Sequence, residues 1–202
     1  GDMEETDASR MLSEMDPDDA AELVSELDYD KAEKLLRLMG VKEQKAIRQL
    51  LGYSEDTAGR IMTSEVVSLP EDATAADAVE KLRNLEDDFE TVYYIYLTDD
   101  DGRLSGVVTL KALAIANPTD RLSAIAIDDD LITASPDEDQ EDVAEDIAKY
   151  NLVALPVVDD NKRLLGIVTV DDALDVLEDE HAEDLRIAGA TTSDSDDHRS
   201  LE

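Results

Sequence analysis

The chain has 202 residues, of which 53 are Asp or Glu and 18 are Lys or Arg, and its net charge is −35 at pH 7. Such an acidic surface repels nucleic acids and anionic membranes and attracts cations, so we expect no nucleic-acid partner. The absence of Cys excludes disulfides, thiolate metal sites and cysteine nucleophiles. No apolar run is long enough to cross a bilayer, so we expect no membrane insertion of this segment.

The first quarter of the chain has the periodicity of helices. Residues 1 to about 10 are polar, and we expect them to be frayed. Asp16 and Pro17 have the residue types of an N-cap and a first helical position, and Gly40 and Gly52 are typical of helix ends. Three apolar rows at helical spacing predict a small helical bundle or superhelix: Ala20, Leu23, Val24 and Leu27; Ala32, Leu35, Leu36 and Met39; and Ile47, Leu50 and Leu51.

From residue 61 onward, a pattern of strands and helices occurs twice. The first copy predicts strands at 66–69, 92–97 and 104–109, with a helix at 74–86. The second copy predicts strands at 131–134, 155–158 and 164–170, with a helix at 143–150. Residues 163–170 repeat residues 103–110 at an offset of 60. An internal repeat of this length predicts two similar modules packed together.

The helix predicted after residue 170 is unusually acidic. Eight of the fourteen residues from 171 to 184 are Asp or Glu, and none is Lys or Arg. Like charges at these spacings repel, so local interactions do not favour the row. Helical spacing places Val170, Ala173, Leu174 and Leu177 on an apolar face, and Asp172, Asp175, Asp179 and Glu183 on the opposite face. Two interpretations fit this acidic face: a solvated surface, or carboxylates that hold hydrated divalent cations.

Two further acidic clusters have a partial structural explanation. Acidic residues in a first helical turn complement the helix dipole, which accounts for part of the run between 137 and 146 and for Asp16, Asp18 and Asp19. The alternative is that these last three face the modules and share ions with them. The turn at 99–102 lacks the spacing of a calcium loop. Two His residues and no catalytic motif lead us to expect no enzymatic activity.

The repeated strings carry a family resemblance. Gly166 to Asp172, GIVTVDD, resembles the signature of the cystathionine-β-synthase (CBS) domain. The first copy keeps Thr109 but has Ala112 where the Asp belongs. The resemblance implies an α/β (α+β) fold, with a tandem CBS pair of two β-α-β-β-α modules behind a small helical bundle. The expected boundaries are a helical segment at 1–58, modules at 59–123 and 124–184, and an acidic flexible tail at 185–202.

Four strings narrow the resemblance to the cytosolic region of MgtE magnesium channels: residues 55–63, 91–96, 139–144 and 166–180. This implies a Mg²⁺-sensing regulatory region, homodimeric through its CBS pairs, on the cytoplasmic side of the inner membrane and coupled to the membrane pore of the same full-length protein. The implied Mg²⁺ ligands are Asp139, Glu141, Ala148 through its carbonyl, Asp172, Asp175, Glu183, Asp184, Asp16 and Asp19. Asn151 stands where the family pattern leads us to expect an Asp, so we expect the site near Asp139 to be either weaker or absent.

A second function class competes for one of these residues. Thr169 with Asp172 is the pattern by which many CBS pairs hold the ribose of an adenine nucleotide such as ATP or AMP. Because the first module has Ala112, at most one such cleft is expected. The alternative function is therefore an adenine-nucleotide-binding regulatory module for another partner. An acidic scaffold without a ligand is the third possibility.

Overall fold

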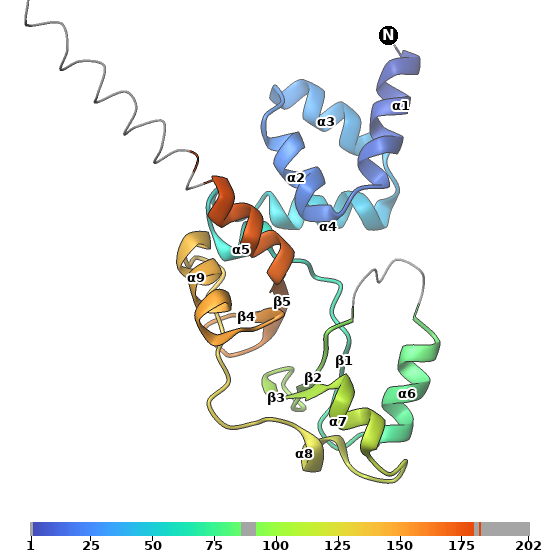
Figure 1. The fold of residues 1–202 in the computed structure, drawn as a ribbon. Helices are drawn as coiled ribbons and strands as arrows, with labels where there is room; N and C mark the ends of the chain where they lie inside the picture. Colours follow the sequence, from blue (N-terminus) through green and yellow to red (C-terminus); the bar gives the residue numbers. More distant parts are fainter. Residues whose placement is uncertain (1, 86–91, 180–181, 183–202) are drawn as a thin grey trace, which may run out of the picture.

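The computed structural model describes residues 2–85, 92–179 and 182. Its N-terminal part consists of four helices: α1 (Asp2–Ser13), α2 (Pro17–Ser25), α3 (Tyr29–Leu38) and α4 (Val41–Leu50) (Figure 1). Helix α2 packs on α4, and α1 packs on α3. Their core contains the buried side chains of Ala20, Ala21, Val24, Leu36, Ile47 and Leu50. The first predicted apolar row is wrong in part, because Leu23 and Leu27 are exposed and Ala21 is buried in their place.

The expectation that residues 1 to about 10 are frayed is wrong for the described part, because they belong to α1. Ser9 and Leu12 are buried, and an ion pair between Glu5 and Lys34 links α1 to α3. A small residue and one apolar residue a turn apart are thus enough to seat a helix whose remaining surface is polar. The packing of α1 on α3 was not predicted, because the segment is mostly polar.

The first module contains β1 (Ser68–Pro70), α6 (Ala75–Arg83), β2 (Tyr94–Thr98), β3 (Leu104–Thr109), α7 (Leu110–Ile115) and α8 (Leu122–Ile125). Its sheet has the order β1-β2-β3, with β1 parallel and β3 antiparallel to β2. A reciprocal pair of hydrogen bonds between Thr74 and Asp77 caps the start of α6. Ile95, Leu97 and Val108 are buried beneath the helices, and Tyr96 is buried on the opposite face of the sheet.

The second module repeats this hairpin. It contains α9 (Gln140–Tyr150), β4 (Ala154–Val158), β5 (Leu164–Thr169) and a helix over residues 170–179. Leu155 pairs with Val168 as Ile95 pairs with Val108, and both hairpins are irregular near the turn. The strand predicted at 131–134 is reduced to one bridge between Ala134 and Val157. The tandem α/β arrangement behind a helical bundle is confirmed (Figure 1).

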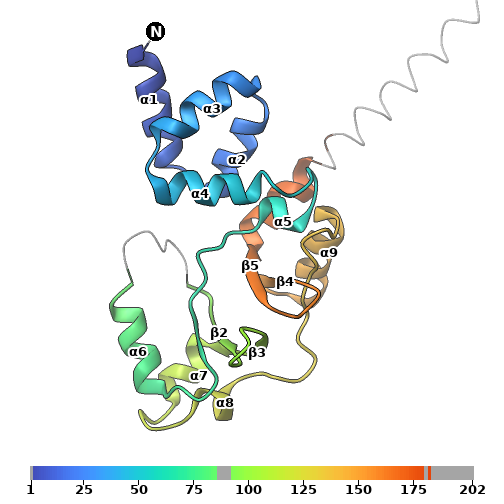
Figure 2. The same ribbon diagram turned by 180° about the vertical axis from the view of Figure 1, so that it is seen from behind.

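The connection between the helical bundle and the modules packs on the second module, although the first follows it in sequence (Figure 2). It contains α5 (Ala58–Ile61), whose Ala58 and Gly59 amides donate to the carbonyls of Glu138 and Pro136 at 2.8 and 2.9 Å. Thr63 pairs with Ile167 of β5, and Met62 is fully buried. Because α5 also contacts α2 and α4, the bundle lies against the second module.

Gly166 of β5 lies directly under this connection, since an added Cβ would be 2.5 Å from the Thr63 carbonyl oxygen. Gly106, the equivalent residue of the first module, has a side-chain methyl as its nearest neighbour, at 3.1 Å. We predict that Gly166→Ala lowers the free energy of unfolding by about 2–3 kcal/mol, against about 1 kcal/mol or less for Gly106→Ala. Urea unfolding of both variants checks this, and equal losses would contradict the role of the connection.

Candidate functional site

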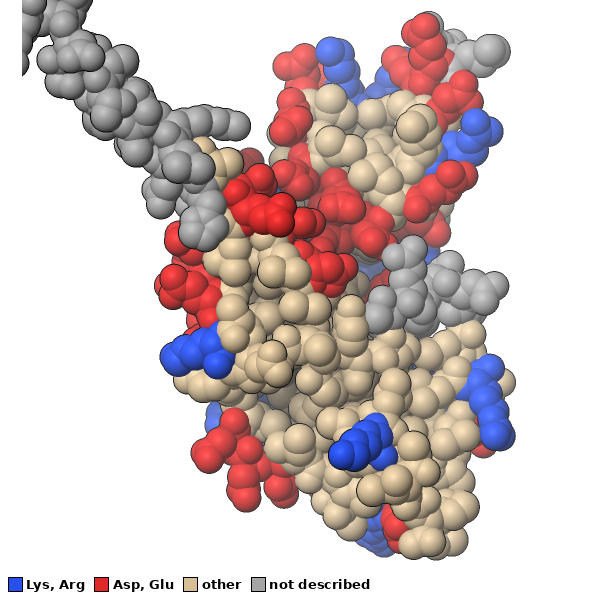
Figure 3. All heavy atoms as spheres, viewed as in Figure 1, with Lys and Arg blue, Asp and Glu red and all other residues tan. Residues whose placement is uncertain are grey.

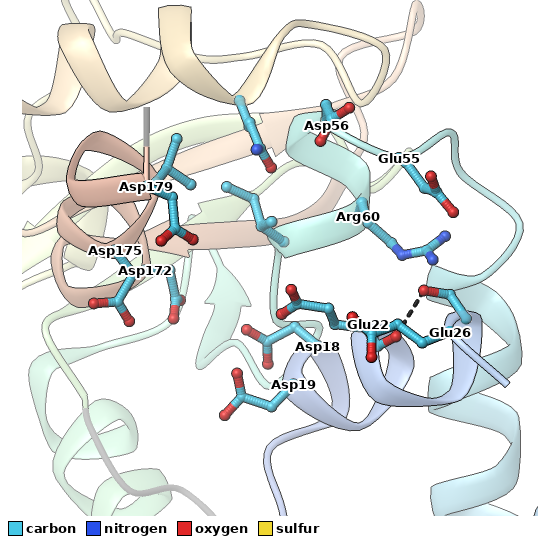
Figure 4. A pocket seen from close by; sticks show the side chains of 14 residues that line it. Asp18, Asp19, Glu22, Glu26, Glu55, Asp56, Arg60, Asp172, Asp175 and Asp179 are labelled. Carbon is cyan, nitrogen blue, oxygen red and sulfur yellow. Dashed lines mark hydrogen bonds between the residues drawn. The ribbon is translucent and has the colours of Figure 1, made fainter. Parts of the chain in front are cut away.

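A cavity of about 360 Å³ separates the helical bundle from the second module. We call it the acidic cleft, because nine of the described residues that line it are acidic and one is basic. Figure 3 shows acidic side chains gathered where the bundle faces the second module. The charged lining residues are Asp18, Asp19, Glu22, Glu26, Glu55, Asp56, Arg60, Asp172, Asp175 and Asp179 (Figure 4).

One wall of the acidic cleft is formed by α2, along its whole length. Pro17 begins this helix, so Asp18 and Asp19 fall in its first turn. Asp16 occupies the N-cap position, but its side chain makes no capping hydrogen bond. Ala20, Ala21 and Val24 are buried against the bundle, which leaves the acidic face of α2 directed to the cleft. N-capping therefore does not account for the Asp16 side chain.

The opposite wall is the helix over residues 170–179. Asp172, Asp175 and Asp179 lie on its cleft face, at the spacing predicted from the sequence. The predicted apolar face needs one correction, because Leu174 is 55% exposed whereas Val176 is buried. The buried face of the helix is centred near Ala173 and Val176. A small rotation of the helix about its axis, relative to the predicted orientation, therefore buries Val176 and exposes Leu174.

Asp172 is held in place by the residue that ends β5. The Thr169 hydroxyl donates to the Asp172 carboxylate at 2.5 Å. In the first module, the equivalent Thr109 hydroxyl accepts from the Ala112 amide at 3.0 Å and caps α7. The Thr–Asp pair of the sequence motif thus forms only in the second module, among the residues described.

The two walls perturb each other electrostatically. Burial raises the pKa of Asp18 to about 7, and repulsion from Asp172 adds to this effect. Burial also raises the pKa of Asp172 to about 6, although the Thr169 hydrogen bond opposes the shift. The pKa of Asp19 is raised by burial and then by the charges of Asp16 and Asp175. Carboxylates on opposite sides of the acidic cleft therefore disfavour each other's charged forms.

Other residues in the predicted ligand set lie elsewhere. Asp139 is the N-cap of α9, and its carboxylate accepts from the Glu141 amide at 2.9 Å; both side chains are exposed. Of this helix, Gln140 lines the cleft. Ala148 lies two turns further along α9, and Asn151 ends it in the left-handed conformation. Glu183 and Asp184 lie outside the described residues.

Sequence reasoning missed several lining residues. Glu22 and Glu26 follow Asp18 at intervals of four on the same face of α2, a spacing that was visible in the sequence. Glu55, Asp56 and Arg60 come from the connection, and only the fold brings them to the cleft. Within the described ranges, no three His, Cys, Asp or Glu side chains lie close enough together to hold a metal ion directly.

Comparison with known protein families accounts for both halves of the chain. Residues 1–56 match the MgtE intracellular N domain, and residues 58–117 and 122–179 each match the CBS domain. The chain belongs to the MgtE family. The resemblance implied the last part of the N domain and a CBS pair, and both kinds of domain are matched. In the part of the chain that the structure describes, no helix is long and apolar enough to cross a membrane.

Individual MgtE relatives agree with this assignment. The magnesium transporter MgtE of Thermus thermophilus is 46% identical over 135 residues, which are 67% of this chain and 30% of the relative. The Enterococcus faecalis MgtE is 45% identical over 64% of this chain and 28% of its own length. The chain therefore spans less than a third of the curated MgtE proteins that it matches.

Solved structures match the fold over most of the chain. The soluble part of a magnesium transporter is 40% identical, with a TM-score of 0.81, and the match covers 87% of this chain and 68% of that one. The cytosolic domain of the Mg²⁺ channel MgtE in complex with ATP is 35% identical, with a TM-score of 0.70, over 85% of this chain and 80% of the other.

The raised pKa of Asp18 predicts a pH effect in the absence of divalent ions. Between the ordinary Asp pKa of 3.8 and about 7, the folded chain holds more protons on Asp18 than the unfolded chain. Stability conferred by the protonated group is therefore lost as the pH rises through this window. We predict that Asp18→Asn raises the free energy of unfolding of the EDTA-treated chain, relative to the wild type, more at pH 7.5 than at pH 5. The difference between the two pH values should be about 1 kcal/mol after allowance for solvent screening.

Thermal unfolding at both pH values, for the wild-type chain and the variant, measures this difference. Asp179→Asn is the matched control, because it removes an exposed carboxylate from the same cleft. A stabilisation by Asp18→Asn that is the same at both pH values would contradict the prediction.

Proposed function

We propose that this chain is the cytosolic Mg²⁺-sensing region of an MgtE-type magnesium transporter, in which divalent ions bridge the acidic cleft. The observation that carries the proposal is the pair of facing carboxylate rows on α2 and on helix 170–179. These rows come from different domains, and charges on each row raise pKa values on the other: Asp172 raises the pKa of Asp18, and Asp19 raises the pKa of Asp172. A cation placed between them removes a repulsion that local structure does not relieve.

The proposed mechanism is electrostatic. Two like charges roughly 4 Å apart repel by about 1 kcal/mol in water and about 4 kcal/mol at an effective dielectric constant of 20. Mg²⁺ keeps much of its hydration shell and usually binds one or two carboxylates, so it suits opposed walls better than a closed cage. Asp19, Asp172 and Asp175 are the proposed ligands in the cleft, with Asp16 beside it. Glu183 and Asp184 follow on the same acidic segment.

A second set of ions is proposed on α9, where Asp139, Glu141 and the Ala148 carbonyl are the ligands implied by the family resemblance. The capping bond of Asp139 leaves carboxylate lone pairs for a hydrated ion. Several weak ions that favour the closed arrangement add their differential binding energies, which is how a population shift is obtained without one tight site.

In the whole protein, closure of the cleft is proposed to regulate a membrane pore, with the sensing region on the cytoplasmic side and paired through its CBS modules as a homodimer. The names of the matched proteins support this, since they are magnesium transporters and their soluble or cytosolic parts. The proposed role is regulation without catalysis.

Adenine-nucleotide binding is the second candidate. The Thr169–Asp172 hydrogen bond presents the two groups of the ribose-binding pattern together, and one matched structure is a complex with ATP. The same carboxylate lines the acidic cleft. Nucleotide and divalent ions would therefore both depend on Asp172, and a substitution there tests the two functions in one protein.

We predict that Mg²⁺ in the millimolar range reduces the radius of gyration and raises the thermal midpoint of the EDTA-treated chain. The double variant Asp172→Asn/Asp175→Asn should lose most of both responses, because it removes two of the bridging carboxylates and much of the repulsion. Small-angle scattering and thermal unfolding at constant ionic strength provide the measurements.

Asp128→Asn/Asp129→Asn is the matched control, since it makes the same charge change at exposed positions outside the cleft. A wild-type chain whose size and thermal midpoint are unchanged from EDTA to tens of millimolar Mg²⁺ would refute ion sensing. Stabilisation by ATP or AMP in such a chain would instead support the nucleotide-binding module.

A further inference from the structure

The acidic cleft already contains one cation of its own. Arg60 is the basic residue among the described lining residues, and it is 9% exposed. Ser9 is the other polar or charged residue buried to this degree within the described ranges. A guanidinium carries a delocalised positive charge. Its presence beside nine carboxylates therefore reduces the net negative charge of the cleft.

Arg60 is fixed to both sides of the domain boundary. Its backbone belongs to α5, which is hydrogen-bonded to the second module through Ala58 and Gly59. Its side chain donates to the carbonyl oxygen of Tyr53 at 3.2 Å, in the segment that follows α4 of the N domain. The Tyr53 ring in turn lies against Gly59, where an added Cβ would be 2.6 Å from it. Arg60 is thus joined to the second module through the backbone of α5 and to the segment after α4 through its side chain.

The remaining donors of the guanidinium are directed to the cleft. Figure 4 shows the Arg60 side chain pointing to the space between Glu26, the C-cap residue of α2, and Glu55 of the connection. Arginine has five N–H donors in a planar group, and the bond to Tyr53 uses one of them. The positive charge of the group, placed near these carboxylates, lowers the repulsion between the N domain and the segment attached to the second module.

We propose that Arg60 is a tethered counter-cation, a positioning residue that keeps the N domain docked on the second module when divalent ions are scarce. This proposal rests on the proposed function, because Arg60 supplies part of the charge neutralisation that Mg²⁺ completes. Arg60 binds no ion itself. It reduces the number of ions that closure must take up, and so lowers the steepness of the response to Mg²⁺.

Domain docking can be followed directly because the chain has no Cys. Dyes on Tyr29→Cys in α3 and Asn161→Cys in the second hairpin report the separation of the N domain and the second module by energy transfer. Both positions are exposed and neutral, and labelled protein is diluted into an excess of unlabelled protein to exclude transfer between chains. Arg60→Gln, Arg60→Lys and the control Arg121→Gln, an exposed Arg outside the cleft, are compared with the parent.

In EDTA at low salt, Arg60→Gln should lower the ratio of docked to undocked chains by about tenfold, the size expected for one charge in a partly solvated cluster. Saturating Mg²⁺ should restore docking, with a steeper titration than in the parent. Raising KCl should shrink the defect, because salt screens the exposed carboxylates. Arg60→Lys should recover most of the docking, and Arg121→Gln should behave like the parent.

Two results would overturn the proposal. Unchanged docking of Arg60→Gln in EDTA would show that the charge has no part in holding the cleft together. Equal defects in Arg60→Gln and Arg60→Lys at every Mg²⁺ and KCl concentration would show that Arg60 contributes its Tyr53 contact alone. A parent chain that ignores Mg²⁺ counts against the proposed function, and the comparison in EDTA still decides the role of Arg60.

Discussion

Repulsion between carboxylates across the domain boundary is the constraint on which this structure depends. Asp18 and Asp172 belong to elements separated by most of the chain, and burial with mutual repulsion raises the pKa of Asp18 to about 7. Apolar packing beneath the cleft, through Met62, Ala58 and Val176, holds the two walls in contact despite this repulsion. The closed arrangement is therefore balanced between a short-range attraction that is always present and a repulsion that depends on bound cations and protons.

The connection makes that balance possible because it attaches the bundle to the correct module. In sequence it leads into the first module, yet Thr63 pairs with β5 and α5 is hydrogen-bonded to the loop before α9. This places α2 opposite the acidic helix 170–179 and away from the first module's less acidic helices (Figures 1 and 3). If the connection packed on the first module instead, helix 170–179 would face solvent, and water would screen its charges.

Much of the fold could be predicted because local patterns agree with it. The repeated Gly-apolar-apolar-Thr string fixed both hairpins, and the helical spacing of Asp172, Asp175 and Asp179 placed them on one face. Helix α1 and the burial of Val176 in place of Leu174 were missed. In both helices the sequence allows more than one face to be buried, and tertiary packing decides which one is. Arg60 and Glu55 were beyond prediction from spacing, since the loop-to-module hydrogen bonds that bring them to the cleft join residues about eighty positions apart.

The two modules use the same backbone arrangement for two different side-chain interactions. Both place a Thr at the end of the second hairpin strand, and both begin a helix immediately after it. Thr109 caps its helix through the Ala112 amide, whereas Thr169 bonds to the Asp172 carboxylate and orients it at the cleft. The fold requires the Thr position and not the acid, because the first module is complete without one. Asp172 is therefore not needed for the module to fold. Its raised pKa shows that its charged form is disfavoured at the domain boundary, and a bound cation there would stabilise that form.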